Sequence, residues 1–159
     1  MAAERITRSR GGGVDLRLSP ETRALVRSMA SQLRELYASE AAADDPAVAR
    51  LFPTPYLDDP LRSLSFDERM AGTLRTSRLE AIEILERTAD ARQLTVGEAD
   101  AWIRTLNDAR LVLGTRLEVT PESTAEDYRD DPLRPPAMFD LYAAVSGIVD
   151  ALVRTLIGD

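Results

Sequence analysis

Apolar residues recur at the spacing of an amphipathic helix in four long segments of this chain, and no other feature constrains its fold as strongly. Ser19-Pro20 begins the first helix, as an N-cap followed by proline at the first helical position, and this helix is expected to reach about residue 42. The second is expected from about residue 61 or 65 to residue 91. The third follows Thr95 and Glu98, a capping-box pair, and the last follows Pro135-Pro136 and covers residues 138–157. The sequence therefore predicts a mainly α fold, a single-domain bundle of about four long helices.

Two smaller elements are expected beside the long helices. Apolar and polar residues alternate over residues 14–18, directly after Gly11-Gly12-Gly13, so a small N-terminal β-hairpin is predicted. Asp44-Asp45-Pro46 is expected to begin one short helix that ends near Leu51-Phe52. The predicted organisation is a basic arm and hairpin, 1–18, and one helical domain, 19–159, which contains an acidic, proline-rich loop over residues 118–136.

The last helix carries apolar residues over about half of its circumference. A helix of this kind is either central in the bundle or half covered by a partner subunit. Broad apolar faces are buried in a core more often than in an interface, so the central position is favoured and a homodimer is the alternative.

Several residue types on which enzymes depend are missing. The 159 residues contain no Cys and no His, and all 20 basic residues are Arg. Thiol nucleophiles, Cys or His metal sites, Ser-His-Asp triads and Schiff-base lysines are therefore excluded, and no metal site or cofactor is expected. Acid-base catalysis would require a carboxylate or a tyrosine with a strongly shifted pKa. The sequence therefore favours a protein that is not an enzyme.

Charge and hydropathy indicate the cell compartment and the class of partner. The first ten residues are charged and no apolar segment follows them, so a cytoplasmic protein without membrane contact is expected. The net charge of −7 disfavours nucleic acid as a partner. The exception is the locally basic N-terminal arm, in which the candidate DNA contacts are Arg5, Arg8 and Arg10.

Two arginines are predicted to lie on apolar helix faces. On a helical wheel Arg110 falls inside the arc that holds Trp102 and Leu106, and Asn107 lies at its margin. Arg78 projects in the same way from the preceding helix. A guanidinium in such a position requires a carboxylate, backbone carbonyls or a bound anion.

Two interpretations of these arginines stay open. In the first, ion pairs fasten the proline-rich residues 51–60 onto the bundle. In the second, Asn107 and Arg110 are donors in a pocket for an anion or a partner peptide. The candidate acidic partners are Asp58 and Asp59, which are preferred for Arg110, and Asp108 and Asp140.

Gly114 shares the apolar arc of Arg110 and has no side chain to fill space. It is therefore predicted to lie at a close approach between two helices.

Two stretches of the sequence resemble a known bacterial family. They read LFPTPYLDDP over residues 51–60 and LNDARLVLGTRL over residues 106–117. With the basic arm, the acidic loop and a closing helix that begins around Asp140 and Tyr142, they are similar to the domain of unknown function numbered two thousand and seventeen over nearly the whole chain. The resemblance implies a shared framework made of Tyr56, Asp58, Asn107, Asp108, Arg110, Gly114 and Arg116.

That family has no established activity, and some of its members carry labels as regulatory proteins. Its genes commonly lie near the gene of the Clp protease adaptor ClpS. The resemblance therefore implies a protein partner that is related to the Clp system.

Three functions follow as hypotheses. The leading one is a non-catalytic cytosolic adaptor or regulatory protein, which would bind its partner through the acidic loop and the groove around Arg78 and Arg110. The second is a transcriptional regulator that contacts DNA through the basic arm. The third is an enzyme that depends on a carboxylate with a strongly raised pKa.

Overall fold

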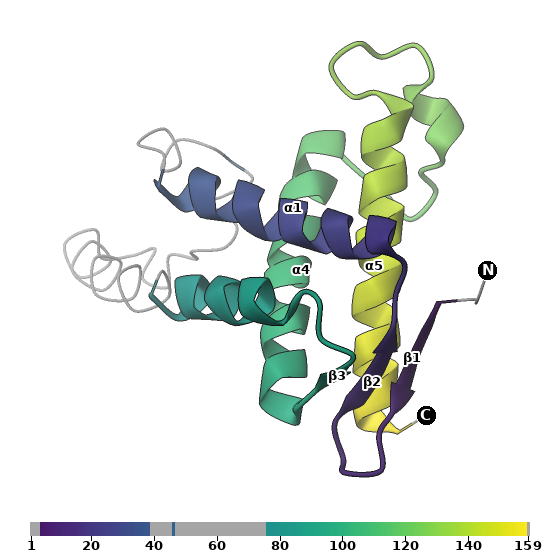
Figure 1. Ribbon diagram of the computed structural model, residues 1–159. Helices are drawn as coiled ribbons and strands as arrows, with labels where there is room; N and C mark the ends of the chain where they lie inside the picture. Colours follow the sequence, from purple (N-terminus) through teal and green to yellow (C-terminus); the bar gives the residue numbers. More distant parts are fainter. Residues whose placement is uncertain (1–3, 39–45, 47–75, 159) are drawn as a thin grey trace, which may run out of the picture.

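The computed structural model describes residues 4–38, 46 and 76–158. A hairpin of β1 (Arg5–Arg8) and β2 (Val14–Arg17) precedes α1 (Pro20–Ala38), and residues 76–88 form a second helix. The short strand β3 (Gln93–Leu94), α4 (Val96–Leu117), the 3₁₀ helix η2 (Ala125–Tyr128) and α5 (Pro136–Ile157) follow. In Figure 1, α4 and α5 stand side by side, and α1 crosses them. The predicted mainly helical fold with an N-terminal hairpin is confirmed.

Three of the four helices begin where the sequence predicted. The amide of Thr22 donates to Ser19 Oγ over 3.1 Å, which caps α1. At the start of α4 the capping box is complete, because the amide of Glu98 donates to Thr95 Oγ1 and the amide of Thr95 donates to Glu98 Oε1. The last helix begins at Pro136, where a missing amide hydrogen costs nothing.

The hairpin belongs to a three-stranded antiparallel sheet in the order β1-β2-β3. Arg5 pairs with Arg17, Thr7 with Asp15, and Val14 with Leu94. The sequence did not predict β3, because two residues are too few to show an alternation. Its presence also ends the 76–88 helix before residue 91, since the amide of Leu16 donates to the carbonyl of Arg92 over 2.7 Å and draws that segment into the sheet.

The core lies between the inner face of the sheet and the helices. Val14 and Leu16 are buried on that face of β2, and they belong to one apolar cluster with side chains from all four helices. Trp102 is fully buried in this cluster and donates its indole N–H to Thr88 Oγ1 over 2.7 Å. Trp102 is therefore a core residue of the described structure.

The last helix lies at the side of the bundle, which differs from the predicted central position. Only four of its 22 residues are buried, Val145, Ile148, Val149 and Leu152. The hairpin covers part of the remaining apolar arc, because Arg8 of β1 donates to the carbonyls of Thr155 and Leu156 at the end of α5. Ile157 stays 68% exposed.

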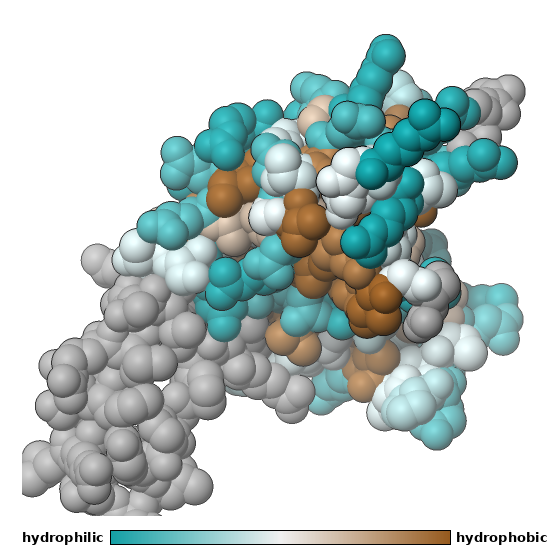
Figure 2. All heavy atoms as spheres, turned by 90° about the horizontal axis from the view of Figure 1, so that it is seen from below, coloured by the Kyte–Doolittle hydropathy of each residue, from teal (hydrophilic) through white to brown (hydrophobic). Residues whose placement is uncertain are grey.

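The same helix is long and apolar enough to cross a membrane by length and composition, with a hydropathy of 1.4 in its most apolar window. Of that window, 22% is buried inside the molecule. The end of the molecule where α5 finishes and α4 starts carries two exposed apolar residues, Ile157 and Val96. Figure 2 looks at the molecule from below and shows apolar side chains gathered there among polar ones.

Residues 118–136 contain more structure than the predicted loop. The Tyr128 ring of η2 is buried, stacks on Phe139 of α5 at 5.4 Å between centroids, and donates its hydroxyl to the carbonyl of Leu117. Arg134 pairs with Glu118 and Asp131. Tyr128 therefore anchors the acidic segment against α5, which its composition alone did not reveal.

Several predictions fall on residues that lie outside the described ones. They are the short helix after Asp44, apart from Pro46, the first part of the second long helix, and the candidate residues Tyr56, Asp58 and Asp59.

Candidate functional site

The most enclosed charged cluster joins three helices. Arg78 Nη1, from the 76–88 helix, lies 2.5 Å from Asp108 Oδ2 of α4, and Tyr37 of α1 donates its hydroxyl to the same oxygen over 3.3 Å. The side chains of Arg78 and Asp108 are 21% and 9% exposed. Arg78 thus pairs with Asp108, one of the further candidates that the sequence offered, and the cluster holds the three helices together.

Burial raises the pKa of both acidic groups in this cluster. It raises the pKa of Asp108 above the usual range of an aspartate, although the hydrogen bond and the charge of Arg78 oppose that shift. Burial also raises the pKa of Tyr37 far above that of a free tyrosine, and the negative charge of Asp108 adds to the shift. Both groups are engaged with each other and with Arg78.

Arg110 lies in a second, more exposed cluster between α4 and α5. Its Nη2 donates to Asn107 Oδ1 over 2.6 Å, and its Nη1 lies 3.4 Å from Asp150 Oδ1. The side chain of Arg110 is 28% exposed and that of Asp150 is 62% exposed. The sequence did not single out Asp150, because nothing local indicates which part of α5 passes Arg110.

These contacts favour the structural interpretation of Arg78 and Arg110 over the pocket interpretation. Each guanidinium bonds a carboxylate of a neighbouring helix, and the Oδ1 of Asn107 accepts a hydrogen bond from Arg110. The predicted partners Asp58 and Asp59 lie outside the described residues, so that part of the prediction stays a prediction.

Gly114 lies at a close approach of α4 and α5, as predicted. A Cβ on Gly114 would lie 3.2 Å from the Tyr142 ring of α5. Tyr142 is half-buried, whereas Asp140 and Arg116 are exposed. Gly114 of the framework that the resemblance implies therefore meets Tyr142 directly, and Asp108 and Arg110 of the same framework hold α4 to two different neighbours.

A hollow of about 320 Å³ lies between α1 and α4. Its walls are mainly apolar and include Leu33, Leu36 and Leu113, while Glu35 and Arg116 stand among the lining residues. Hollows of this size and composition can bind small ligands or an apolar side chain of a partner.

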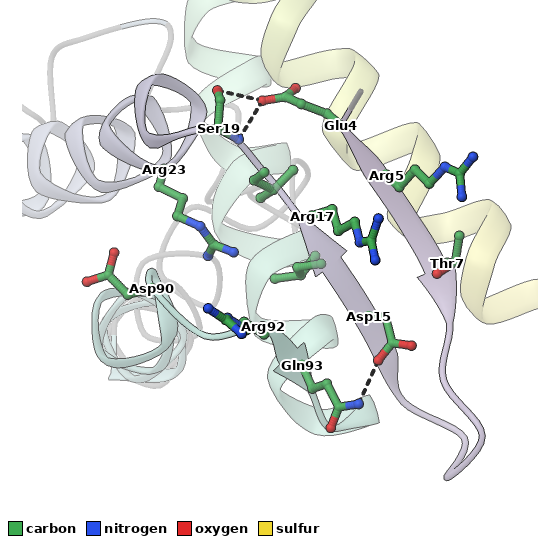
Figure 3. Close-up of a pocket in the computed structure, with 12 residues that line it drawn as sticks. Glu4, Arg5, Thr7, Asp15, Arg17, Ser19, Arg23, Asp90, Arg92 and Gln93 are labelled. Atoms are coloured by element: carbon green, nitrogen blue, oxygen red, sulfur yellow. Dashed lines mark hydrogen bonds between the residues drawn. The ribbon is translucent and has the colours of Figure 1, made fainter. Parts of the chain in front are cut away.

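A larger and more polar hollow, of about 1150 Å³, lies over the outer face of the sheet and the start of α1. Figure 3 shows that side chains from both strands of the hairpin, from α1 and from the segment before β3 surround it. Four arginines line it, Arg5, Arg17, Arg23 and Arg92, together with three acids, Glu4, Asp15 and Asp90.

The three arginines that were predicted to contact DNA occupy different positions. Arg5 points to the outer face of the sheet and lines the large hollow, and Arg10 is exposed in the turn of the hairpin. Arg8 lies on the opposite face of β1 and holds the end of α5. Sequence analysis missed Arg92, which is distant in sequence from the hairpin. It also missed the pairing of Arg5 with Arg17, which follows from the hairpin register.

No group of three or more His, Cys, Asp or Glu side chains that could hold a metal ion occurs among residues 4–38, 46 and 76–158. The carboxyl group with a raised pKa is the enclosed Asp108, whose oxygen already accepts bonds from Arg78 and Tyr37.

Comparisons with known proteins point to one family. The family model of a domain of unknown function, DUF2017, matches residues 2–156. Proteins named oxidative stress regulator AosR, from Mycobacterium bovis and Mycobacterium tuberculosis, are 30% identical over 131 residues, which cover 72% of this chain. The match spans only 59% of the length of those relatives. No solved structure matches the fold.

Proposed function

Because the chain belongs to the DUF2017 family, and because a relative at 30% identity is named an oxidative stress regulator, we propose that it is a non-catalytic regulatory protein that acts by binding another protein. The proposal includes a cytoplasmic location and leaves the Clp system as one source of the partner. A homodimer is compatible with it.

The observation that carries the proposal is that the charged side chains between the helices bond one another. Asp108 bonds Arg78 and Tyr37, and Arg110 bonds Asn107 and Asp150. Groups that are satisfied by one another position helices, whereas a catalytic acid or base needs access to a substrate. The chain contains no Cys, His or Lys, so few side chains are left that could act in catalysis. We therefore expect the function to depend on the surface that binds the partner.

The absence of cysteine limits how such a regulator could respond to oxidants. The relative's name refers to oxidative stress, but a thiol switch requires cysteine, and these 159 residues contain none. If this chain serves the same response, any thiol that senses the oxidant lies outside these 159 residues.

Transcriptional regulation through direct DNA contact is the second candidate. The hairpin presents Arg5 and Arg10 to solvent, which favours it, but Arg8 is committed to the carbonyls at the end of α5. The net charge of −7 also opposes approach to a polyanion.

Reciprocal affinity capture tests the proposal. The tagged protein is used as bait in an extract of the organism that makes it, each captured protein is then used as bait in turn, and the complex is rebuilt from two purified proteins. We expect one partner to survive both directions and to form a defined complex in analytical ultracentrifugation, a measurement that also reports a homodimer.

Two results would contradict the proposal. One is binding of generic duplex DNA that weakens steeply with added salt, while no protein forms a defined complex. The other is turnover of a substrate that is abolished by Asp108→Asn under conditions in which the variant remains folded.

A further inference from the structure

We propose that the outer face of the sheet is a docking site for an acidic segment of a partner protein, whose carboxylates bind Arg5, Arg17 and Arg92. This inference rests on the proposed function, because it names the surface and the chemistry of the partner.

The register of the hairpin places two like charges opposite each other. Arg5 of β1 and Arg17 of β2 are directly paired in the antiparallel ladder, so both side chains project from the same face of the sheet. Like charges in this position destabilise a sheet. Without a ligand, an oppositely charged or neutral pair at these positions would make the hairpin more stable. Arg92 lines the same hollow from the segment before β3. The arrangement therefore has a cost that a bound anion would remove.

Other charged groups around the hollow are already engaged. Arg23 donates to the carbonyls of Ala89 and Ala91, and Asp15 accepts from Gln93 over 2.8 Å. Glu4 accepts bonds from Ser19 and Thr22 at the start of α1, which lowers its pKa, and Asp90 pairs with Arg27.

The guanidinium groups of Arg5, Arg17 and Arg92 have no such partner among the described residues. In Figure 3, dashed lines join Glu4 to Ser19 and Asp15 to Gln93, and none reaches these three arginines. All three are exposed. A guanidinium binds a carboxylate through two parallel N–H donors. Three guanidinium groups without a partner around one hollow can therefore bind several carboxylates.

The mixed charge of the hollow favours a protein segment over nucleic acid. Glu4, Asp15 and Asp90 also line it, and a duplex, which carries phosphates at regular short intervals, would place some of them near these acids. A peptide can place its acids at the three arginines and neutral residues elsewhere. The half-buried side chain of Leu18 in the lining suits such neutral residues, and about 1150 Å³ is ample for an extended segment.

Fluorescence anisotropy with a defined probe tests the site. The probe is a short fluorescein-labelled peptide of alternating glutamate and serine, titrated with the intact protein at low salt. We expect saturable binding that weakens as salt is added. The variant Arg5→Gln/Arg17→Gln/Arg92→Gln should raise the Kd by about tenfold or more.

Arg129→Gln is the matched control. Arg129 follows η2 on the acidic segment, is largely exposed, and pairs only with Glu126 at the surface. The variant removes one positive charge from a distant part of the molecule, so the Kd should change by less than about twofold. A loss in Arg129→Gln as large as in the single variant Arg17→Gln would show an effect of net charge alone and overturn the proposal.

Stability separates a binding site from a structural role. If Arg17 serves only the fold, Arg17→Gln should lower the Tm. If it serves a ligand, removal of the like-charge pair should raise the Tm of the free protein at low salt, and this gain should fade as salt is added. A lower Tm together with unchanged peptide binding overturns the proposal, and circular dichroism of each variant verifies that it is folded.

The remaining outcomes also decide between the candidates. No binding of the peptide by the wild-type protein, or binding of duplex DNA in its place that depends on the same arginines, overturns the proposed site. If a captured partner binds the triple variant as tightly as the wild type, this site is wrong and the proposed function stands. If no partner forms a defined complex, the proposed function itself fails.

Discussion

Arg78 Nη1 and Asp108 Oδ2 lie 2.5 Å apart and connect the 76–88 helix to α4 at a point where both side chains are largely buried. Tyr37 adds α1 to the same oxygen. Helices that pack through apolar side chains alone tolerate small rotations and shifts, whereas a shared carboxylate oxygen fixes one relative position. The stability of the bundle should therefore depend on this pair more than on any surface ion pair described here.

Arg78→Met should destabilise the protein by about 3–5 kcal/mol, because it leaves the charge of Asp108 buried without its main partner. The double variant Arg78→Met/Asp108→Asn should recover a large part of that loss, since the penalty lies mainly in the stranded charge. Urea unfolding followed by circular dichroism measures both. Losses that simply add in the double variant would contradict the coupling.

The stability should also depend on pH through Asp108. The folded protein holds the proton of this carboxyl more tightly than the unfolded chain, because burial raises its pKa. Its contribution to the free energy of unfolding is therefore largest below the ordinary aspartate pKa of about 4 and declines as the pH rises toward the raised folded value.

Asp108→Asn removes this dependence. The free energy of unfolding of the wild type minus that of the variant should decrease as pH rises above about 4, and urea unfolding at several pH values measures it. A difference that increases with pH would mean that Arg78 outweighs burial and lowers the folded pKa.

Arg110→Met should have a small effect. Its contact with Asp150 is 3.4 Å long, and Asp150 is mostly exposed, so the ion pair contributes less than about 1 kcal/mol. Asp150→Asn should change the free energy of unfolding by a similar small amount. A loss of several kcal/mol for Arg110→Met alone would point to an acid of residues 51–60 as an additional partner.

Gly114→Leu should cost about 1–3 kcal/mol, because even a Cβ at this position meets the Tyr142 ring at 3.2 Å. Gly147 is the matched control. It lies on the exposed side of α5 with no described atom within 4 Å of a Cβ, so Gly147→Ala should stabilise the helix by about 0.5–1 kcal/mol. Thermal unfolding of the two variants gives the comparison, and equal shifts of the same sign would refute the packing argument.

Local signals were sufficient for most helix boundaries. Ser19-Pro20, the Thr95 and Glu98 capping box, and Pro135-Pro136 each act within one turn of their own helix, so the sequence alone identified them. The third strand is different, because β3 is held by backbone bonds to a hairpin about 80 residues earlier in the chain. Two residues are too few to show the alternation of apolar and polar side chains that would predict this pairing.

The site was less predictable than the fold for the same reason. A helical wheel showed that Arg78 and Arg110 need partners, but the choice between Asp108, Asp150 and the acids of residues 51–60 depends on how helices pass one another. The face of each hairpin arginine, by contrast, follows from period-two alternation once the register is known. Arg8 and Arg5 therefore lie on opposite faces of β1, although the sequence alone treats both as equivalent basic residues of one arm.

The bond between Arg8 and the last carbonyls of α5 links residues that are 147 and 148 positions apart in sequence. During synthesis on the ribosome, the hairpin emerges long before the helix end that holds it. The packing of its inner face, which carries Val14 and Leu16, stays incomplete until α5 has left the exit tunnel. Final packing of the first element is therefore a late step that follows the synthesis of α5, and until then the apolar inner face of the hairpin is open to chaperones and proteases.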